Sequence, residues 1–91
     1  MFLKDPDAVL EYRVDWCDAL VQGVSITSGE WRIHPLEDGG LYVVDESVDG
    51  VLGKALLAGG VPGHVYEAGN LVTFSDGTID ERSVVIRVGE R

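Results

Sequence analysis

Residues 10–16, Leu-Glu-Tyr-Arg-Val-Asp-Trp, alternate between apolar and charged side chains. Successive side chains of a β-strand point to opposite faces, so this alternation predicts a strand with one buried face and one solvent-facing side. The same two-residue period recurs in residues 24–34, 64–74 and 83–89. Stretches of this kind, repeated along a short chain, indicate an all-β protein.

The segments between these stretches complete the pattern. Residues 41–44 and 52–58 are short apolar runs that predict two further strands, whereas residues 45–50 are expected to form a polar connection. Glycine-rich turns separate the strands at intervals typical of two packed sheets. The sequence thus predicts an all-β, immunoglobulin-like β-sandwich of six to seven short antiparallel strands. Residues 1–8 are expected to be an N-terminal arm, and residues 9–91 a single immunoglobulin-like domain.

Local features place the core. The apolar residues of the second stretch change parity after Ile26, and a β-bulge at Ser28-Gly29 is expected to restore their inward direction. Tyr66 follows Gly63 at the start of a late strand, as in the tyrosine corner of immunoglobulin-like folds. Three large aromatic residues fall on the apolar parities and are therefore expected in the core: Trp16, Trp31 and Tyr66.

Charge and composition exclude several classes of protein. The chain has 91 residues, with 16 Asp and Glu against 7 Lys and Arg, and a net charge of −9. Affinity for phosphate backbones depends on Lys and Arg, so nucleic acid is not an expected partner, and anionic membranes repel the chain similarly. No stretch approaches the roughly 20 apolar residues of a transmembrane helix, and residues 1–7 do not resemble a secretory signal.

The residues with chemical potential form no catalytic or metal-binding constellation. His34 and His64 lie in no metal-ligand spacing, and the single Cys17 excludes both an internal disulfide and a zinc site of several thiolates. Residues 45–50 match the first half of a calcium loop, but Leu56 stands where the terminal carboxylate should be. We therefore expect a solvated acidic turn, with weak calcium binding at acidic loops left open. No catalytic residue, cofactor or metal site is expected.

A family resemblance carries the functional interpretation. Residues 4–12, Lys-Asp-Pro-Asp-Ala-Val-Leu-Glu-Tyr, followed by Val-Asp-Trp at 14–16, resemble the opening of phage fiber-tail adaptor proteins, small components of tailed phages and prophages. The resemblance continues in order along the chain, through residues 26–33, 39–44, 57–66 and 77–88. It implies an immunoglobulin-like, non-enzymatic structural protein of the virion that joins the tail or neck to fibres.

The resemblance also implies partners and location. The partners are other phage structural proteins of the tail, neck or fibre, and several copies of this chain are expected in a symmetric ring. Neither nucleic acid nor a membrane is an expected partner. The location is the tail or neck of the virion, after synthesis in the bacterial host cytoplasm. The alternative is an immunoglobulin-like carbohydrate- or receptor-binding module, which needs exposed aromatic residues or an acidic metal loop. Tyr42 and residues 45–49 are the candidates for such a site.

The N-terminal arm is the predicted contact with a partner. Phe2 and Leu3 precede Pro6, which lacks an N–H donor and stops a regular strand. The arm is therefore expected to lie apart from the sandwich, where an apolar pair favours a partner surface over water. Phe2, Leu3, Asp5 and Asp7 are the candidate partner-contact residues.

Overall fold

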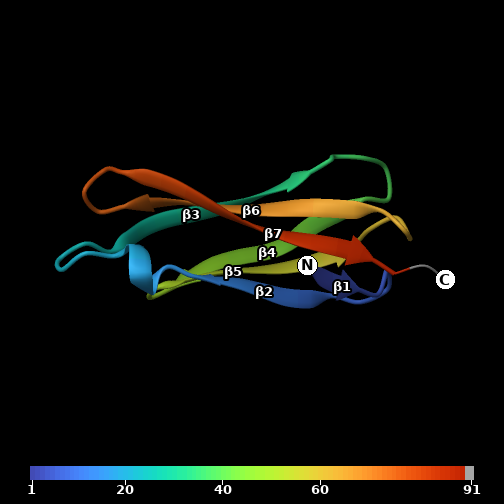
Figure 1. The fold of residues 1–91 in the computed structure, drawn as a ribbon, viewed down its shortest axis with the longest axis horizontal. Coiled ribbons are helices and arrows are strands. Elements are labelled where there is room, and N and C mark those ends of the chain that lie inside the picture. The colour runs from blue at the N-terminus through green and yellow to red at the C-terminus, as the bar shows by residue number, and fades with distance from the viewer. Residues whose placement is uncertain (90–91) are drawn as a thin grey trace.

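The computed structural model describes residues 1–89, which form two stacked sheets in a body of 47 × 20 × 18 Å (Figure 1). The four-stranded sheet contains, in spatial order, β1 (Phe2–Lys4), β7 (Ile79–Val88), β6 (Val65–Phe74) and β3 (Ile26–His34). The three-stranded sheet contains β2 (Leu10–Asp15), β5 (Leu52–Gly59) and β4 (Leu41–Asp49). A short 3₁₀ turn, η1 (Cys17–Ala19), follows β2.

The strand order is that of an immunoglobulin domain. Strands β7, β6 and β3 lie in the order of immunoglobulin strands G, F and C, and they face β2, β5 and β4 in the order B, E and D. The predicted all-β immunoglobulin-like sandwich is therefore confirmed. One ladder departs from the antiparallel pattern, since β1 pairs with β7 in parallel.

The core forms where the apolar parities of the two sheets meet. Trp16, Trp31 and Tyr66 are only 0%, 7% and 1% exposed, as their parities predict. Trp16 and Tyr66 are among the largest fully buried side chains of the core. The smaller core residues come from both sheets: Val14, Ile33, Leu41, Ala55, Leu57, Ala68, Val72, Phe74, Ile86 and Val88.

The tyrosine corner expected at Tyr66 is present. The Tyr66 hydroxyl accepts a hydrogen bond from the backbone N–H of Val61 at 2.9 Å and donates one to the carboxylate of Glu37. Ala68 lies two residues further on, at the position of the second cysteine of antibody domains, and is fully buried. Apolar packing thus replaces the inter-sheet disulfide of those domains.

Two details of the strands differ from the predictions. The bulge in β3 lies between Ile26 and Ser28, slightly before the predicted position. Residues 45–49 are not a polar connection but the second half of β4, which pairs with β5 after a register shift between Val43 and Asp45. That prediction was wrong because an edge strand with a solvent-facing side tolerates polar residues when a neighbouring strand supplies its backbone partners.

The N-terminal residues also differ from the prediction. Residues 2–4 do not lie apart from the sandwich but form β1, in register with residues 86–88 of β7 (Figure 1). Pro6 does follow the strand, as its missing N–H requires, yet three residues before it are enough to pair with the edge of the sheet. The expectation of a separate apolar arm is therefore corrected.

Candidate partner-binding surface

Strand β1 is fastened to the sandwich through Lys4. The Lys4 side chain is 0% exposed, and its ammonium donates hydrogen bonds to the carbonyl oxygens of Gly59 at 2.8 Å and Asp5 at 2.9 Å. The carbonyl of Lys4 accepts a hydrogen bond from the N–H of Gly89 at 2.8 Å. Burial lowers the pKa of this ammonium, and the charges of Asp5 and Asp7 oppose that shift. The buried ammonium therefore ties β1 to the end of β5.

The other two residues of β1 present apolar surface on opposite faces. Phe2 turns toward the second sheet, where its ring makes an edge contact with Tyr12 at a centroid distance of 5.4 Å, and it is still 50% exposed. Leu3 turns to the outer face of the sheet, opposite Arg87 in register, and is 74% exposed. The anchor at Lys4 thus holds two apolar side chains at the edge of the molecule in a fixed position.

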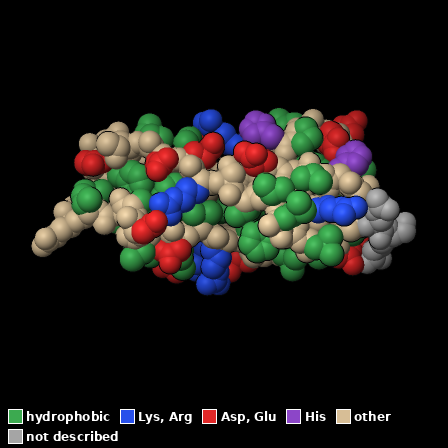
Figure 2. All heavy atoms as spheres, viewed as in Figure 1, with side chains coloured by type: hydrophobic (Ala, Val, Ile, Leu, Met, Phe, Trp, Pro, Cys, Tyr) green, Lys and Arg blue, Asp and Glu red, His purple; other side chains and the backbone are tan. Residues whose placement is uncertain are grey.

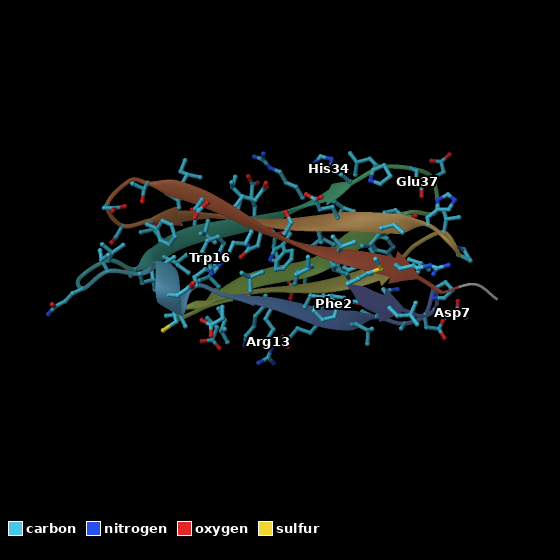
Figure 3. The ribbon with its side chains drawn as sticks, in the orientation of Figure 1. Phe2, Asp7, Arg13, Trp16, His34 and Glu37 are labelled. Carbon is cyan, nitrogen blue, oxygen red and sulfur yellow. The ribbon has the colours of Figure 1, made fainter. Side chains whose placement is uncertain are left out.

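A groove runs between β1 and β2, the neighbouring edges of the two sheets. It has a volume of about 360 Å³ and is lined by Phe2, Leu3, Leu10, Glu11, Tyr12 and Arg13. Arg13 is paired with Glu11 at 2.7 Å, so the charged rim of the groove is internally neutralised. Figure 2 shows hydrophobic side chains gathered over this half of the molecule, and Figure 3 shows Phe2 between the two strands. The groove is an apolar surface open to a partner.

Asp5 and Asp7 form the turn that carries the chain from one sheet to the other. The Asp5 carboxylate accepts a hydrogen bond from the N–H of Asp7 at 2.9 Å, and the Asp5 carbonyl accepts one from Ala8 at 3.0 Å. Both carboxylates are solvent-exposed. The four predicted contact residues thus lie along β1 and the turn that follows it, and contact with a partner remains a prediction for each.

A second groove lies on the opposite side of the sandwich, between β3 and β4. It also has a volume of about 360 Å³, and its lining includes Leu36 and Tyr42, which are 82% and 56% exposed. The loop that carries Leu36 is held by Glu37, whose carboxylate accepts the Tyr66 hydrogen bond and lies 2.8 Å from Nδ1 of His64. These two hydrogen bonds, that of Tyr66 first, lower the pKa of Glu37.

The residues weighed for metal binding or catalysis do not converge. Residues 45–49 lie along β4, where an extended backbone spreads their oxygens instead of gathering them. In residues 1–89, no three side chains of His, Cys, Asp or Glu are grouped as a metal site would require. Cys17 is exposed on η1, and His64 faces Glu37. No helix within the same part of the chain is long and apolar enough to cross a membrane.

Comparison with known proteins places the chain in a family. A family model described as podophage GP4 fiber-tail adaptor protein gp77 matches residues 4–87, nearly the whole chain. The chain belongs to this family. The predicted resemblance to phage fiber-tail adaptors is thereby confirmed, and with it a structural role in the phage tail. A comparison with curated proteins gives no match.

Sequence reasoning missed two features of this fiber-tail adaptor, the buried Lys4 that anchors β1 and the groove at Leu36. The buried role of Lys4 has no signal in the sequence, because an isolated lysine beside two aspartates is typical of a solvated position. The groove at Leu36 had none either, because a single leucine between Pro35 and a polar turn is ordinary at a protein surface.

Proposed function

We propose that this fiber-tail adaptor joins two different structural proteins of a tailed-phage particle, the tail or neck on one side and a fibre on the other. The observation that carries the proposal is the apolar edge at Phe2 and Leu3, which the buried Lys4 holds in place next to an open groove. A second groove on the opposite side, at β3 and β4, supplies the other contact that an adaptor needs.

The energetics are adequate for assembly. Full burial of an aliphatic or aromatic side chain contributes about 1.5–3 kcal/mol, and Leu3 is almost fully available for such burial. Repeated contacts in a symmetric ring of several copies multiply this contribution. The net charge of −9 keeps free subunits apart after synthesis in the bacterial host cytoplasm and favours basic patches on the partners. In this proposal the protein is non-enzymatic and acts only through protein–protein contacts.

Particle assembly with a Leu3→Glu variant tests the proposal. A charge at this exposed position leaves the fold intact but opposes apolar docking, so incorporation into particles should fall about tenfold or more. Val21→Glu is the matched control, because Val21 is also exposed, at 66%, and lies in the loop after η1, outside the lining of both grooves. Normal incorporation of the Leu3 variant, with both variants melting like the wild type, would refute the role of this edge.

The alternative of a carbohydrate- or receptor-binding module had two candidate features, Tyr42 and residues 45–49, and the second is part of β4 and not an acidic loop. Trp16 and Trp31 belong to the core, so neither offers a face on which a sugar ring could stack. Tyr42 lies exposed beside the groove between β3 and β4, and the adaptor role accounts for that surface as well.

A further inference from the structure

Strand β7 has an edge that no other strand covers. It runs for 10 residues and pairs with β6 along nearly its whole length, whereas on its other side only residues 86–88 face β1. Residues 79–85 therefore form an open edge in the part of the chain that the structure describes. This open edge lies on the same side of β7 as β1, opposite β6 (Figure 1).

The direction of the backbone groups along this edge follows from hydrogen bonds at its end. The N–H of Val88 donates to His64 at 2.9 Å and its carbonyl accepts from Gly63 at 2.9 Å, so Val88 faces β6. Gly89, one residue later, donates to Lys4 on the opposite side. Because backbone groups alternate along a strand, the odd-numbered residues of β7 direct their N–H groups outward. These are Ile79, Glu81, Ser83 and Val85. The N–H of Glu81 already donates to the carboxylate of Asp80 at 2.8 Å, so Ile79, Ser83 and Val85 carry the donors that an added strand would meet.

Two of the other edge strands, β3 and β4, are modified in ways that discourage strand addition, and a third, β2, has only 6 residues. Both β3 and β4 contain a register shift, and the N–H of Trp31 on β3 is occupied by the carboxylate of Glu46 at 3.1 Å. The ladder between β6 and β7 has no such shift, so β7 presents a regular edge. A long, regular edge is the kind of surface to which an extended segment adds as a further strand.

The charges beside the open edge specify the partner. The Arg82 guanidinium lies 4.5 Å from the centroid of the Trp16 ring and donates to the carboxylate of Asp18 at 2.8 Å. Hydrogen bonding to Asp18, and then the charges of Asp80 and Asp15, raise the pKa of Arg82. Since this cation is already paired, the carboxylates of Asp15, Asp18 and Asp80 leave an excess of negative charge beside the edge. The carboxylate of Glu81 lies over Gly69 of β6, away from the edge.

We propose that the open edge at residues 79–85 binds an extended, lysine- or arginine-bearing segment of another protein by β-strand addition. The outward N–H groups of Ile79, Ser83 and Val85 and the outward carbonyls supply the hydrogen bonds, and the surrounding carboxylates select a basic strand. The same carboxylates disfavour a second copy of this acidic chain. The site is separate from the groove between β1 and β2, so evidence against one of the two sites does not count against the other.

Titration of the isotopically labelled full chain with two synthetic peptides tests the site. One eight-residue peptide alternates valine with lysine, and the other alternates valine with glutamate. The lysine peptide should shift the amide resonances of residues 79, 83 and 85 and slow their hydrogen exchange. The glutamate peptide should bind at least about tenfold more weakly.

Ser83→Pro and Ser83→Ala form the matched pair of variants. Proline removes one outward N–H without breaking the β6 ladder, and it should weaken the lysine peptide about tenfold, whereas alanine keeps the N–H and should bind normally. Circular dichroism checks that the proline variant folds. If it does not, Asp80→Asn replaces it, and this variant should reduce the preference for lysine over glutamate.

Several results would overturn the proposal. These are amide shifts confined to residues 10–13, equal binding of the two peptides, full binding by the proline variant, or absence of binding at millimolar peptide. Concentration-dependent dimers whose exchange protection maps to residues 79–85 would make the occupant a second copy and refute the basic segment.

Discussion

The indole N–H of Trp16 donates a 2.8 Å hydrogen bond to the side-chain oxygen of Asn70, between the two sheets. Trp16 and Asn70 are 0% and 1% exposed, so this polar contact lies fully inside the apolar core. The amide nitrogen of Asn70 also donates to the carbonyl of Glu30 at 3.2 Å. Asn70 thus links the end of β2 to β6 and β3.

Replacement of Asn70 by alanine should lower the free energy of unfolding by about 1–3 kcal/mol. The reason is that the buried indole N–H of Trp16 and the carbonyl of Glu30 each lose a partner. Urea denaturation measures the change. Glu67→Ala, at an exposed position on the same strand, is the control and should stay within about 0.5 kcal/mol of the wild type. If Asn70→Ala lowers the free energy of unfolding by less than about 0.5 kcal/mol, the expected role of Asn70 is contradicted.

Gly53→Ala should be strongly destabilising, and its effect should depend on Asn70. A methyl group at Gly53 would lie 2.0 Å from the Asn70 side-chain oxygen, so the amide would have to move. We expect a loss of about 1–3 kcal/mol, reduced in the Asn70→Ala background by an interaction of at least about 0.5 kcal/mol. Gly89→Ala, whose added methyl group would meet only the Lys4 carbonyl at 3.7 Å, is the control. Strict additivity of the two core substitutions would rule out the contact.

Stability should fall in acid partly through Glu37. Its pKa is lowered in the folded state by Tyr66 and His64, so its contribution is present above the ordinary value of 4.5 and is lost as the pH falls through the lower folded value. Glu37→Gln should therefore destabilise the protein near neutral pH and lose its effect in that acidic window. Tyr66→Phe should flatten the same part of the profile. Chemical denaturation of the three proteins at a series of pH values measures this, and parallel profiles would disprove it.

Deletion of residues 1–4 should destabilise the isolated protein. The deletion removes β1 and two hydrogen bonds of Lys4. Its ammonium donates to the carbonyl of Gly59, and its carbonyl accepts from the N–H of Gly89. A loss of 1 kcal/mol lowers the melting temperature of a domain of this size by about 4–8 °C, and we expect at least that change. Removal of Met1 alone, which is 83% exposed, is the control. An unchanged melting temperature after the longer deletion would show that β1 does not contribute to the stability of the sandwich.

Calcium should leave the stability unchanged. Residues 45–49 are held in β4 by pairing with β5, and an extended strand cannot fold its side chains around one ion. Thermal melts in excess calcium and in excess chelator should coincide. A melting temperature that rises by more than a few degrees with calcium would contradict this prediction, because it would show that the acidic residues bind the ion together.

The sequence was most informative where a strand has one buried face. The alternation in β2 and around Tyr66 in β6 follows directly from burial on one side, so both strands and their core residues could be predicted. The same reasoning failed for β1, which is too short to display a period, and for the polar half of β4. Those two segments are strands because of their neighbours β7 and β5, and pairing between distant segments leaves no local pattern.

The candidate surface was predictable only in part. Phe2 and Leu3 were predicted as exposed apolar residues because they precede Pro6, and both are exposed. Their anchoring depends on Lys4 reaching the carbonyl of Gly59, 55 residues away in the chain, which no spacing reveals. The open edge of β7 has the same origin, since β1 begins its pairing with β7 only at Phe2, opposite Ile86.

The parallel pairing of β1 with β7 has a mechanical consequence. The first strand and the last run side by side in the same direction, from Phe2 opposite Ile86 to Lys4 opposite Val88. Tension that pulls the beginning of β1 away from the end of β7 slides the two strands past each other, so their hydrogen bonds are loaded together in shear and do not open one at a time. The bond from Lys4 to Gly59 adds a further link that must break in the same event. A protein built in this way resists tension that is applied along its length through its first and last strands.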